Sequence, residues 1–269
     1  MYDRLSRDVK MASTQNLSDG RMYEQKVIDA VELAISPERF RPYILRAGGS
    51  RLRAVWIYER NTAIAEALYG VTQGIEIAVR NSIHRELSGA FGAYWFEEFS
   101  FGETQDKMLT EAKGAIARDR RPVTPGAVVA ELNLGFWVAL LTRAYEKTLW
   151  VPCLHRAFPH AYVEKRGQTA VIQVKIDRCD IHERLDNIRY LRNRIAHHEP
   201  LLKLDLPQCY SRTLEALKWI CPISAQWVRT TNCFPQRFHE KPLKYDPPKL
   251  APEPSKPLPG RPSLVVGKG

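Results

Sequence analysis

The 269-residue chain has few cysteines, and none of them are paired in sequence. Its five cysteines are scattered from Cys153 to Cys233, and no two of them form a CxxC motif. An odd, dispersed set argues against a disulfide framework and against a structural zinc site. We therefore expect the cysteines to be reduced and to occupy structural positions.

The sequence also lacks the signals that take a chain into or across a membrane. It contains no apolar run of about 18 residues, the length that a membrane-spanning helix needs. Residues 1–20 have no apolar centre of the kind found in secretory signals. These absences predict a cytoplasmic protein with no membrane partner.

Common local signatures of enzymes and cofactor sites are missing as well. There is no HExxH, Walker loop, GxGxxG or nucleophile elbow. The adjacent His197 and His198 are weak metal candidates, because neighbouring side chains on a helix point about 100° apart. We expect no metal and no cofactor.

Basic residues clearly outnumber acidic ones. The chain holds 40 Lys and Arg against 30 Asp and Glu, which gives a formal net charge of +10 and a pI near 9.4. This balance favours a polyanionic partner such as nucleic acid over acidic small molecules.

Composition divides the chain into three parts. Residues 235–269 hold nine of the eighteen prolines and little apolar periodicity, which predicts a disordered tail that contributes little to stability. Residues 1–22 are expected to form a disordered N-terminal extension. Residues 23–234 remain as one helical domain.

Helical periodicity covers most of that domain. Ser36 as N-cap, Pro37 at the first helical position and the pair Gly48-Gly49 mark both ends of a short helix. A much longer helix is expected from residue 50 to about residue 88, with a bend allowed at its glycines 70 and 74.

Further helices are expected at 104–118, from Thr124-Pro125 through residue 149, at 178–198 and at 208–228. The segment 168–177 is rich in β-branched residues, but a lone strand has no visible partner, so we expect it to be irregular or the start of a helix. Without alternating strands or a repeat, these segments predict an all-α helical bundle.

The segment 178–198 combines an apolar stripe with a basic residue inside it. The stripe consists of Ile181, Leu185, Ile188, Leu191 and Ile195. Arg192 falls within this stripe, and an arginine facing a core needs a carboxylate, a phosphate or a partner surface. An ion pair with a carboxylate such as Glu76 and a functional anion site are both open.

Two other side chains accompany Arg192. Asn193 and His197 are four residues apart and share a helix face, and His197 lies in the last turn, where the helix dipole favours a protonated imidazole. A guanidinium, an amide and an imidazole are the groups needed to cleave a phosphodiester without a metal. RNA fits this chemistry because its 2′-hydroxyl supplies the nucleophile.

The string from Arg192 to His197 resembles the signature of the HEPN superfamily, and "LRNRIAHHEP" is similar to the abortive-infection (Abi-like) family within it. The similarity extends over roughly residues 35–230. It implies a HEPN-like helical bundle with additional helices, a homodimer with two motifs at one interface, and a metal-independent endoribonuclease. Such enzymes act as toxins in phage defence or toxin–antitoxin systems, with an antitoxin protein or antitoxin RNA as a partner.

The resemblance also implies roles for single residues. Arg192 would stabilise charge on the scissile phosphate, Asn193 would orient, and His197 would act as general base or acid. His198 satisfies the looser family spacing and is expected nearer the apolar stripe, so either histidine fits. Arg189 and Arg194 on the same helix are predicted to bind RNA.

A second polar stripe lies on the long helix. Glu76, Arg80 and His84 follow one another at four-residue spacing, with Asn81 beside them. They form either a Glu–Arg ion pair with a surface histidine or a network that holds Arg192 or the substrate.

Two readings without catalysis compete with the nuclease. The basic helix can bind RNA or a protein partner without cutting it, because arginines bind phosphate regardless of catalysis. Alternatively, Arg192 is paired within a purely structural helical protein.

Overall fold

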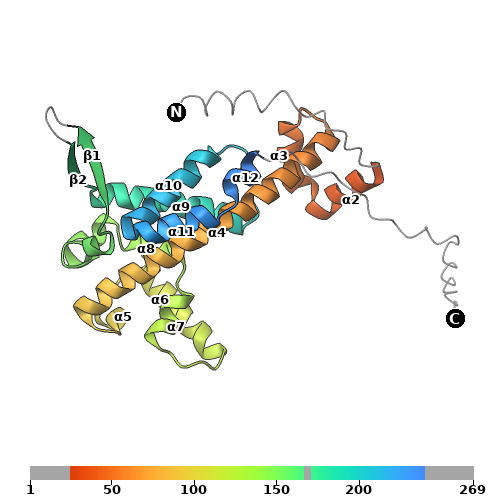
Figure 1. Ribbon diagram of the computed structural model, residues 1–269. Helices are drawn as coiled ribbons and strands as arrows, with labels where there is room; N and C mark the ends of the chain where they lie inside the picture. Colours follow the sequence, from red (N-terminus) through yellow and green to blue (C-terminus); the bar gives the residue numbers. More distant parts are fainter. Residues whose placement is uncertain (1–24, 167–170, 240–269) are drawn as a thin grey trace, which may run out of the picture.

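The structure of the chain, a computed structural model, describes residues 25–166 and 171–239. The predictions for residues 1–22, and for the tail from residue 240 onward, fall outside this part. The described part is mostly helical, which confirms the all-α class in its coarse form (Figure 1).

Short connections join the helices in chain order. The α-helices are α2 (Gln25–Ile35), α3 (Pro37–Arg46), α4 (Arg51–Phe91), α5 (Trp95–Glu98), α6 (Glu103–Arg118), α7 (Pro125–Glu131), α8 (Leu134–Ala139), α9 (Arg178–Ala196), α10 (Leu206–Ile220), α11 (Pro222–Thr231) and α12 (Phe234–His239). Short irregular helical turns are η1 (Arg143–Tyr145), η2 (Glu146–Trp150) and η3 (Leu154–Ala157), and the strands are β1 (Tyr162–Arg166) and β2 (Val171–Lys175).

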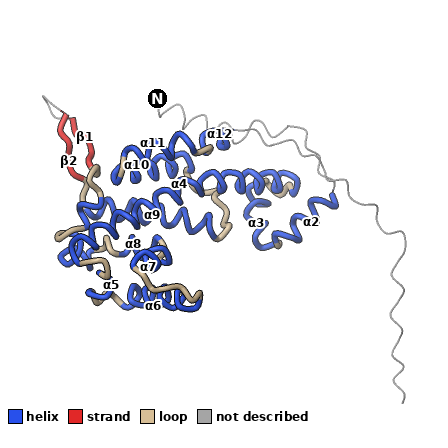
Figure 2. The backbone as a smooth tube through the Cα atoms, turned by 60° about the horizontal axis from the view of Figure 1, so that its bottom comes forward, coloured by secondary structure: helices blue, strands red, loops and turns tan. Residues whose placement is uncertain are grey.

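Helix α4 is the longest element and runs along the body of the molecule (Figures 1 and 2). Ser50 caps its first turn, and it continues without interruption through Gly70 and Gly74. A Cβ atom at either glycine would lie 3.2 Å from a side-chain atom of Asn232 or Val228. The glycines therefore let α11 and the residue that follows it approach α4 closely, and they do not break the helix.

Two groups of buried side chains pack along α4. At one end, α2 and α3 cover its first turns through residues such as Phe40, Tyr43 and Val55. The larger core surrounds the rest of α4, with Trp95 and Trp137 fully buried at its centre. Figure 2 shows the α2–α3 pair at the opposite end of the molecule from the β-hairpin.

Two of the predicted long helices are interrupted: the first is divided among α7, α8, η1 and η2, and the second between α10 and α11. The helix that begins at Thr124 ends after Glu131, because the Asn133 side chain accepts a hydrogen bond from the Phe136 amide and starts α8. The prediction of one helix over 208–228 is also wrong. Cys221 adopts an extended conformation before Pro222, as residues preceding proline do, and this separates α10 from α11.

The prediction for residues 168–177 is wrong. Val171–Lys175 forms strand β2, which pairs antiparallel with β1, and Val163 lies opposite Val174. The partner strand β1 lies just before β2 in sequence. Its sequence YVEKR is mostly polar, so hydrophobic periodicity does not predict a strand there. The hairpin projects from the helical body (Figure 1).

Helix α9 begins and ends with side-chain and backbone caps. The Asp177 carboxylate accepts a hydrogen bond from the Asp180 amide at 2.8 Å. At the other end the helix stops at Ala196, two residues before the predicted end, and His197 is its C-cap. The chain then turns toward Pro200, a residue whose predecessor avoids helical geometry.

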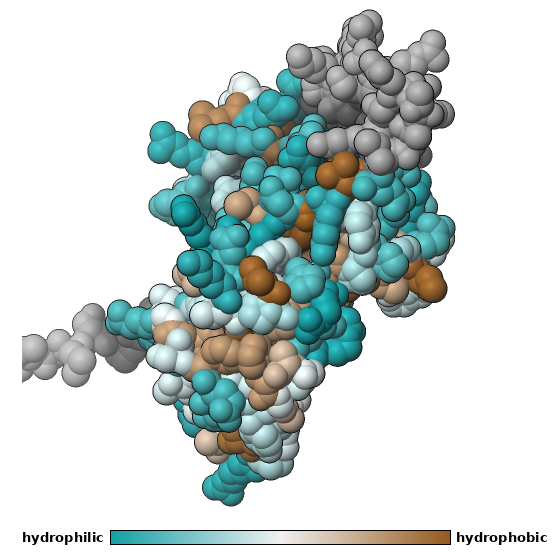
Figure 3. Space-filling view, turned by 90° about the vertical axis from the view of Figure 1, so that its left-hand side faces the viewer, coloured by the Kyte–Doolittle hydropathy of each residue, from teal (hydrophilic) through white to brown (hydrophobic). Residues whose placement is uncertain are grey.

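Figure 3 shows how apolar and polar residues are distributed over one face of the molecule. In Figure 3, which views the left-hand side of Figure 1, hydrophilic residues cover most of the upper part of the face and strongly apolar residues form small separate spots. Single exposed apolar side chains of this kind are normal on folded proteins. Across residues 25–166 and 171–239, no helix has both the length and the apolar character needed to cross a membrane.

The predicted start of the tail at Pro235 is wrong by five residues, because residues up to His239 belong to α12. Phe234 is buried and stacks on Tyr210 at 4.7 Å between ring centroids. Phe238 packs beside Phe234, and its carbonyl accepts a hydrogen bond from Arg60 on α4.

We predict that deleting residues 236–269 lowers the melting temperature by about 2–4 °C or more, because the Phe238 contacts contribute about 1 kcal/mol or more. Deleting only residues 240–269 is the matched control, and its Pro-rich composition predicts a change within about 2 °C. Differential scanning calorimetry checks both variants. Equal melting temperatures for the two would contradict a stabilising role for α12.

Candidate functional site

An ion pair joins Arg192 on α9 to Glu76 on α4. Arg192 Nε lies 3.0 Å from one carboxylate oxygen of Glu76, and Nη2 donates to the other at 3.4 Å. The Arg192 side chain is 31% exposed and that of Glu76 is 18% exposed. The carboxylate partner expected for an arginine in an apolar stripe is therefore Glu76, and the guanidinium still reaches the surface.

The ion pair with Arg192 shows which partner Glu76 of the polar stripe on α4 has. Glu76 uses both carboxylate oxygens on Arg192, and no ion pair between Glu76 and Arg80 occurs in the described part of the chain. Of this stripe, Glu76 alone contacts Arg192 within the described ranges, and neither alternative holds for the stripe as a whole. Arg80 is half-buried and Asn81 is exposed on the same helix.

Asn193 and His197 lie at the exposed end of α9. Asn193 is half-buried, and its Oδ1 is 3.5 Å from Arg192 Nη1, which is a long hydrogen bond. His197 is exposed. Among the described residues, no hydrogen bond joins the His197 side chain to Arg192 or Asn193. One chain thus brings the three motif residues to one helix end without linking the imidazole to the guanidinium.

His198 occupies a strained position just beyond the helix. Its φ is 56°, in the left-handed region that favours glycine. Its amide donates to the Ile195 carbonyl at 3.1 Å, and the Glu199 amide donates to the Arg194 carbonyl at 2.8 Å. These two bonds form a Schellman motif with His198 at the position where glycine is usual. His198 is exposed there, as is His197.

The two arginines predicted to bind RNA both have partners within the chain. Arg189 Nε lies 2.7 Å from the Asp186 carboxylate. Arg194 pairs with Glu199 at 3.1 Å, donates to the Tyr190 hydroxyl and to the Pro200 carbonyl, and stacks over the Tyr190 ring. Through Glu199 and Pro200, Arg194 therefore stabilises the position of the segment that follows the motif.

His84 contacts the buried Trp95 of the hydrophobic core and not the motif residues of α9. Its Nδ1 accepts a hydrogen bond of 2.9 Å from the indole N–H of Trp95, and the Ser88 hydroxyl is 3.3 Å from the same nitrogen. Burial lowers the pKa of His84 below its ordinary value. An Nδ1 that accepts from Trp95 carries no proton, so the structure favours the neutral ring at this position.

Sequence reasoning missed Asn61, which fixes the segment after the motif. Its buried side chain accepts a hydrogen bond of 2.8 Å from the Leu201 amide. The available signal was an amide at a position of the long helix where apolar residues are otherwise buried. Helix α4 thus binds α9 through Glu76 and the segment after α9 through Asn61.

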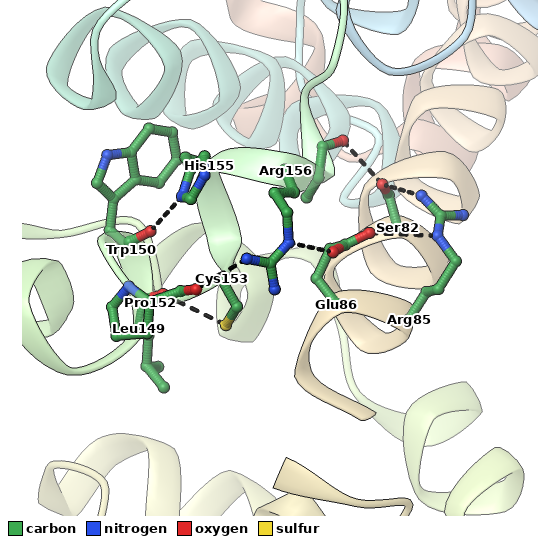
Figure 4. Close-up of polar contacts among 10 residues, drawn as sticks. Ser82, Arg85, Glu86, Leu149, Trp150, Pro152, Cys153, His155 and Arg156 are labelled. Carbon is green, nitrogen blue, oxygen red and sulfur yellow. Dashed lines mark hydrogen bonds and ion pairs between the residues drawn. The ribbon is translucent and has the colours of Figure 1, made fainter. Parts of the chain in front are cut away.

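A separate polar cluster joins the far part of α4 to η3 (Figure 4). Glu86 accepts hydrogen bonds from both Arg156, at 3.0 Å, and Arg85, at 3.4 Å. Ser82 donates to the Ala157 carbonyl at 2.8 Å and accepts from Arg85. Every labelled charge in this cluster has a partner of opposite sign, so the cluster has a structural role.

The described side chains form no cluster of metal ligands. In the part of the chain that the structure describes, no three His, Cys, Asp or Glu side chains come together as a possible metal site.

Comparisons with protein-family models, with curated proteins and with solved structures find no match to this chain.

We predict that the protein loses stability as the pH falls from about 6.5, the ordinary pKa of histidine. His84 has a lowered pKa in the folded state, so the unfolded state binds more protons below pH 6.5 and unfolding becomes easier there. Melting temperatures measured between pH 7.5 and pH 5, where most carboxylates stay charged, test this.

The variant His84→Gln keeps an acceptor but removes the titration, and its stability should depend less on pH over this range. The exposed His160 provides the control, because His160→Gln should retain the wild-type slope. A wild-type slope in His84→Gln would refute the assignment to His84.

Proposed function

We propose that this chain is a metal-independent endoribonuclease of the HEPN type, acting in the cytoplasm as a toxin of a phage-defence or toxin–antitoxin system. The observation that carries the proposal is that the Arg192 guanidinium stays 31% exposed at the end of α9 even though it is paired with Glu76. The C-cap of this helix is the exposed His197. A toxin of this kind would be restrained by an antitoxin protein or an antitoxin RNA.

The chemistry requires a base, an acid and a cation. The base removes the proton of the RNA 2′-hydroxyl, whose oxygen attacks the adjacent phosphorus, and the bond from phosphorus to the 5′-oxygen breaks. The acid gives a proton to that 5′-oxygen, so the products are a 2′,3′-cyclic phosphate and a 5′-hydroxyl. Arg192 stabilises the additional negative charge on the phosphate in the transition state, and Asn193 orients the guanidinium or the substrate.

Glu76 contributes to this scheme by fixing the arginine. A bidentate carboxylate restricts the rotation of a long side chain, so the guanidinium loses less freedom when it binds phosphate. The remaining Nη1 nitrogen is the one that points to Asn193 and away from the carboxylate.

Two proton-transfer groups are needed, whereas a single His197 supplies only one. The second comes either from His198 of the same chain or from His197 of a second copy. The exposed surface near the motif supports the second source, because Tyr190, on the motif helix α9, is 51% exposed. Aromatic side chains of this kind are enriched in protein interfaces.

A non-catalytic RNA-binding module is the second candidate function. It is favoured by the absence, among the described residues, of any hydrogen bond between His197 and Arg192. The ends of the RNA product distinguish the two functions, since a binding module produces no cyclic phosphate.

We predict that the purified protein cuts single-stranded RNA in the presence of EDTA and leaves 2′,3′-cyclic phosphate ends, while matched DNA survives. His197→Ala should lower the rate by roughly 10²–10⁴-fold, the usual contribution of a positioned acid or base, and should leave RNA binding nearly unchanged. Arg192→Ala should lower the rate to a similar extent and also weaken binding.

His198→Gly is the matched control for the neighbouring histidine. It removes the imidazole at a backbone position that favours glycine, so it should raise stability by about 0.5–1 kcal/mol and leave cleavage intact. Loss of cleavage in His198→Gly with retention in His197→Ala would move the role to His198. Tight RNA binding without cyclic-phosphate ends under any condition would leave the binding module as the function.

We also predict a symmetric homodimer with α9 at its interface. Light scattering at micromolar concentration should give twice the mass of the chain, and the specific cleavage rate should fall when the protein is diluted below its dimerisation constant. Tyr190→Glu places a charge in the expected interface and should reduce both mass and rate. A monomeric wild-type protein with full activity would rule out a site shared between copies.

A further inference from the structure

Arg80 stands beside the ion pair of the candidate site. It follows Glu76 by one helical turn, and residues four apart on a helix are neighbours on one face. Because Glu76 holds Arg192, Arg80 shares a face of α4 with the residue that anchors the motif arginine, and Figure 1 shows α9 lying along α4.

Arg80 differs from the arginines of the motif helix in its charge partners. Arg189 pairs with Asp186, Arg192 with Glu76 and Arg194 with Glu199. Within the described ranges, Arg80 has no carboxylate partner and no hydrogen bond. The Arg80 guanidinium therefore has no counter-charge from the described part of the chain.

The two ends of the Arg80 side chain have different surroundings. Its Nε is buried without an acceptor. Its two terminal nitrogens also lack partners, but they are not among the buried unpartnered atoms, so they reach solvent. The packed stem restricts the side chain, while its charged end stays free to meet a ligand. A cation that is already held in place loses little freedom on binding.

The cluster of Figure 4 shows what a structural arginine looks like on the same helix. Arg85 donates to both Glu86 and Ser82, although its side chain is 65% exposed. Arg80 is more buried than Arg85 and yet has no carboxylate partner in the described part of the chain, so its solvent-reaching end is available to an external anion.

We propose that Arg80 and Arg192 together bind one backbone phosphate of single-stranded RNA, with Glu76 holding Arg192 in the orientation that this requires. The inference rests on the proposed function for the choice of RNA. Phosphate suits the site because it offers several acceptor oxygens to two guanidiniums and carries a charge opposite to that of Arg80. Arg80 thereby positions the phosphodiester but transfers no proton.

The test measures binding separately from cleavage. The probe is a short single-stranded RNA in which every 2′-hydroxyl is methylated, so it cannot be cut by internal attack. Dissociation constants are measured over a series of salt concentrations for the wild type, Arg80→Gln and Arg85→Gln. Melting temperatures of all variants are recorded alongside.

Arg80→Gln should weaken binding about tenfold and lower the slope of log K against log salt by about 0.7, the value for one phosphate contact on a single strand. Arg85→Gln removes an equal charge from the same helix and should change neither quantity. On cleavable RNA, Arg80→Gln should raise KM more than it lowers kcat, as expected for a group that binds the ground state and the transition state alike.

An unchanged salt slope and dissociation constant in Arg80→Gln would overturn the proposal, whether or not the wild type cuts RNA. Weakened binding in a protein that never produces cyclic-phosphate ends would keep the phosphate site and reject the nuclease. If Arg80→Gln fails to fold, Arg80→Lys decides the question. Lysine keeps the charge but loses the planar fork, so the slope should persist and binding should weaken a few-fold. Unchanged binding in Arg80→Lys would also overturn the proposal.

Discussion

The packing of α9 against α4, with the Arg192 guanidinium held by Glu76, is the interaction on which the candidate site depends. The apolar stripe of α9 requires a buried face, and that face carries an arginine that must keep its charge. A carboxylate on the facing helix meets both requirements. It allows the stripe to pack closely while it leaves part of the guanidinium at the surface.

Helix α4 fixes this arrangement at several points along its length. Asn61 binds the backbone after α9, Glu76 binds Arg192, and the close approach at Gly70 and Gly74 places α11 on another side. A long helix that contacts many elements limits relative motion between α4 and α9. The candidate site is therefore built on rigid elements, which is the arrangement that a positioned phosphate requires.

The end of α9 carries a conformational cost beside the proposed chemistry. His198 holds a left-handed backbone conformation where glycine would be less strained, and the turn places His197 at the C-cap. Arg194 and its contacts to Tyr190 and Glu199 hold this turn in place. The strain at His198 is thus balanced by side-chain contacts of the preceding turn, and the two histidines remain exposed on either side of the helix end.

The sequence by itself determined the features that depend on neighbouring residues. The caps at Ser36, Ser50 and Thr124 and the helical class follow from local hydrogen bonding and from apolar periodicity. Periodicity could not locate the breaks before α8 and α11, because apolar spacing continues across both. It also missed the hairpin, whose first strand is polar and gains stability only from its partner.

Tertiary structure alone decided how the site residues are paired. Glu76 and Arg192 are 116 positions apart, and a helical pattern gives the face of a residue but not the helix that covers it. The same limit applies to His84, whose partner Trp95 belongs to the core, and to Arg80, which has no carboxylate partner in the described structure. Sequence named the motif from residue types and spacing. The structure decided which of its charges are satisfied within the chain, because pairing over long sequence separations depends on how the helices pack.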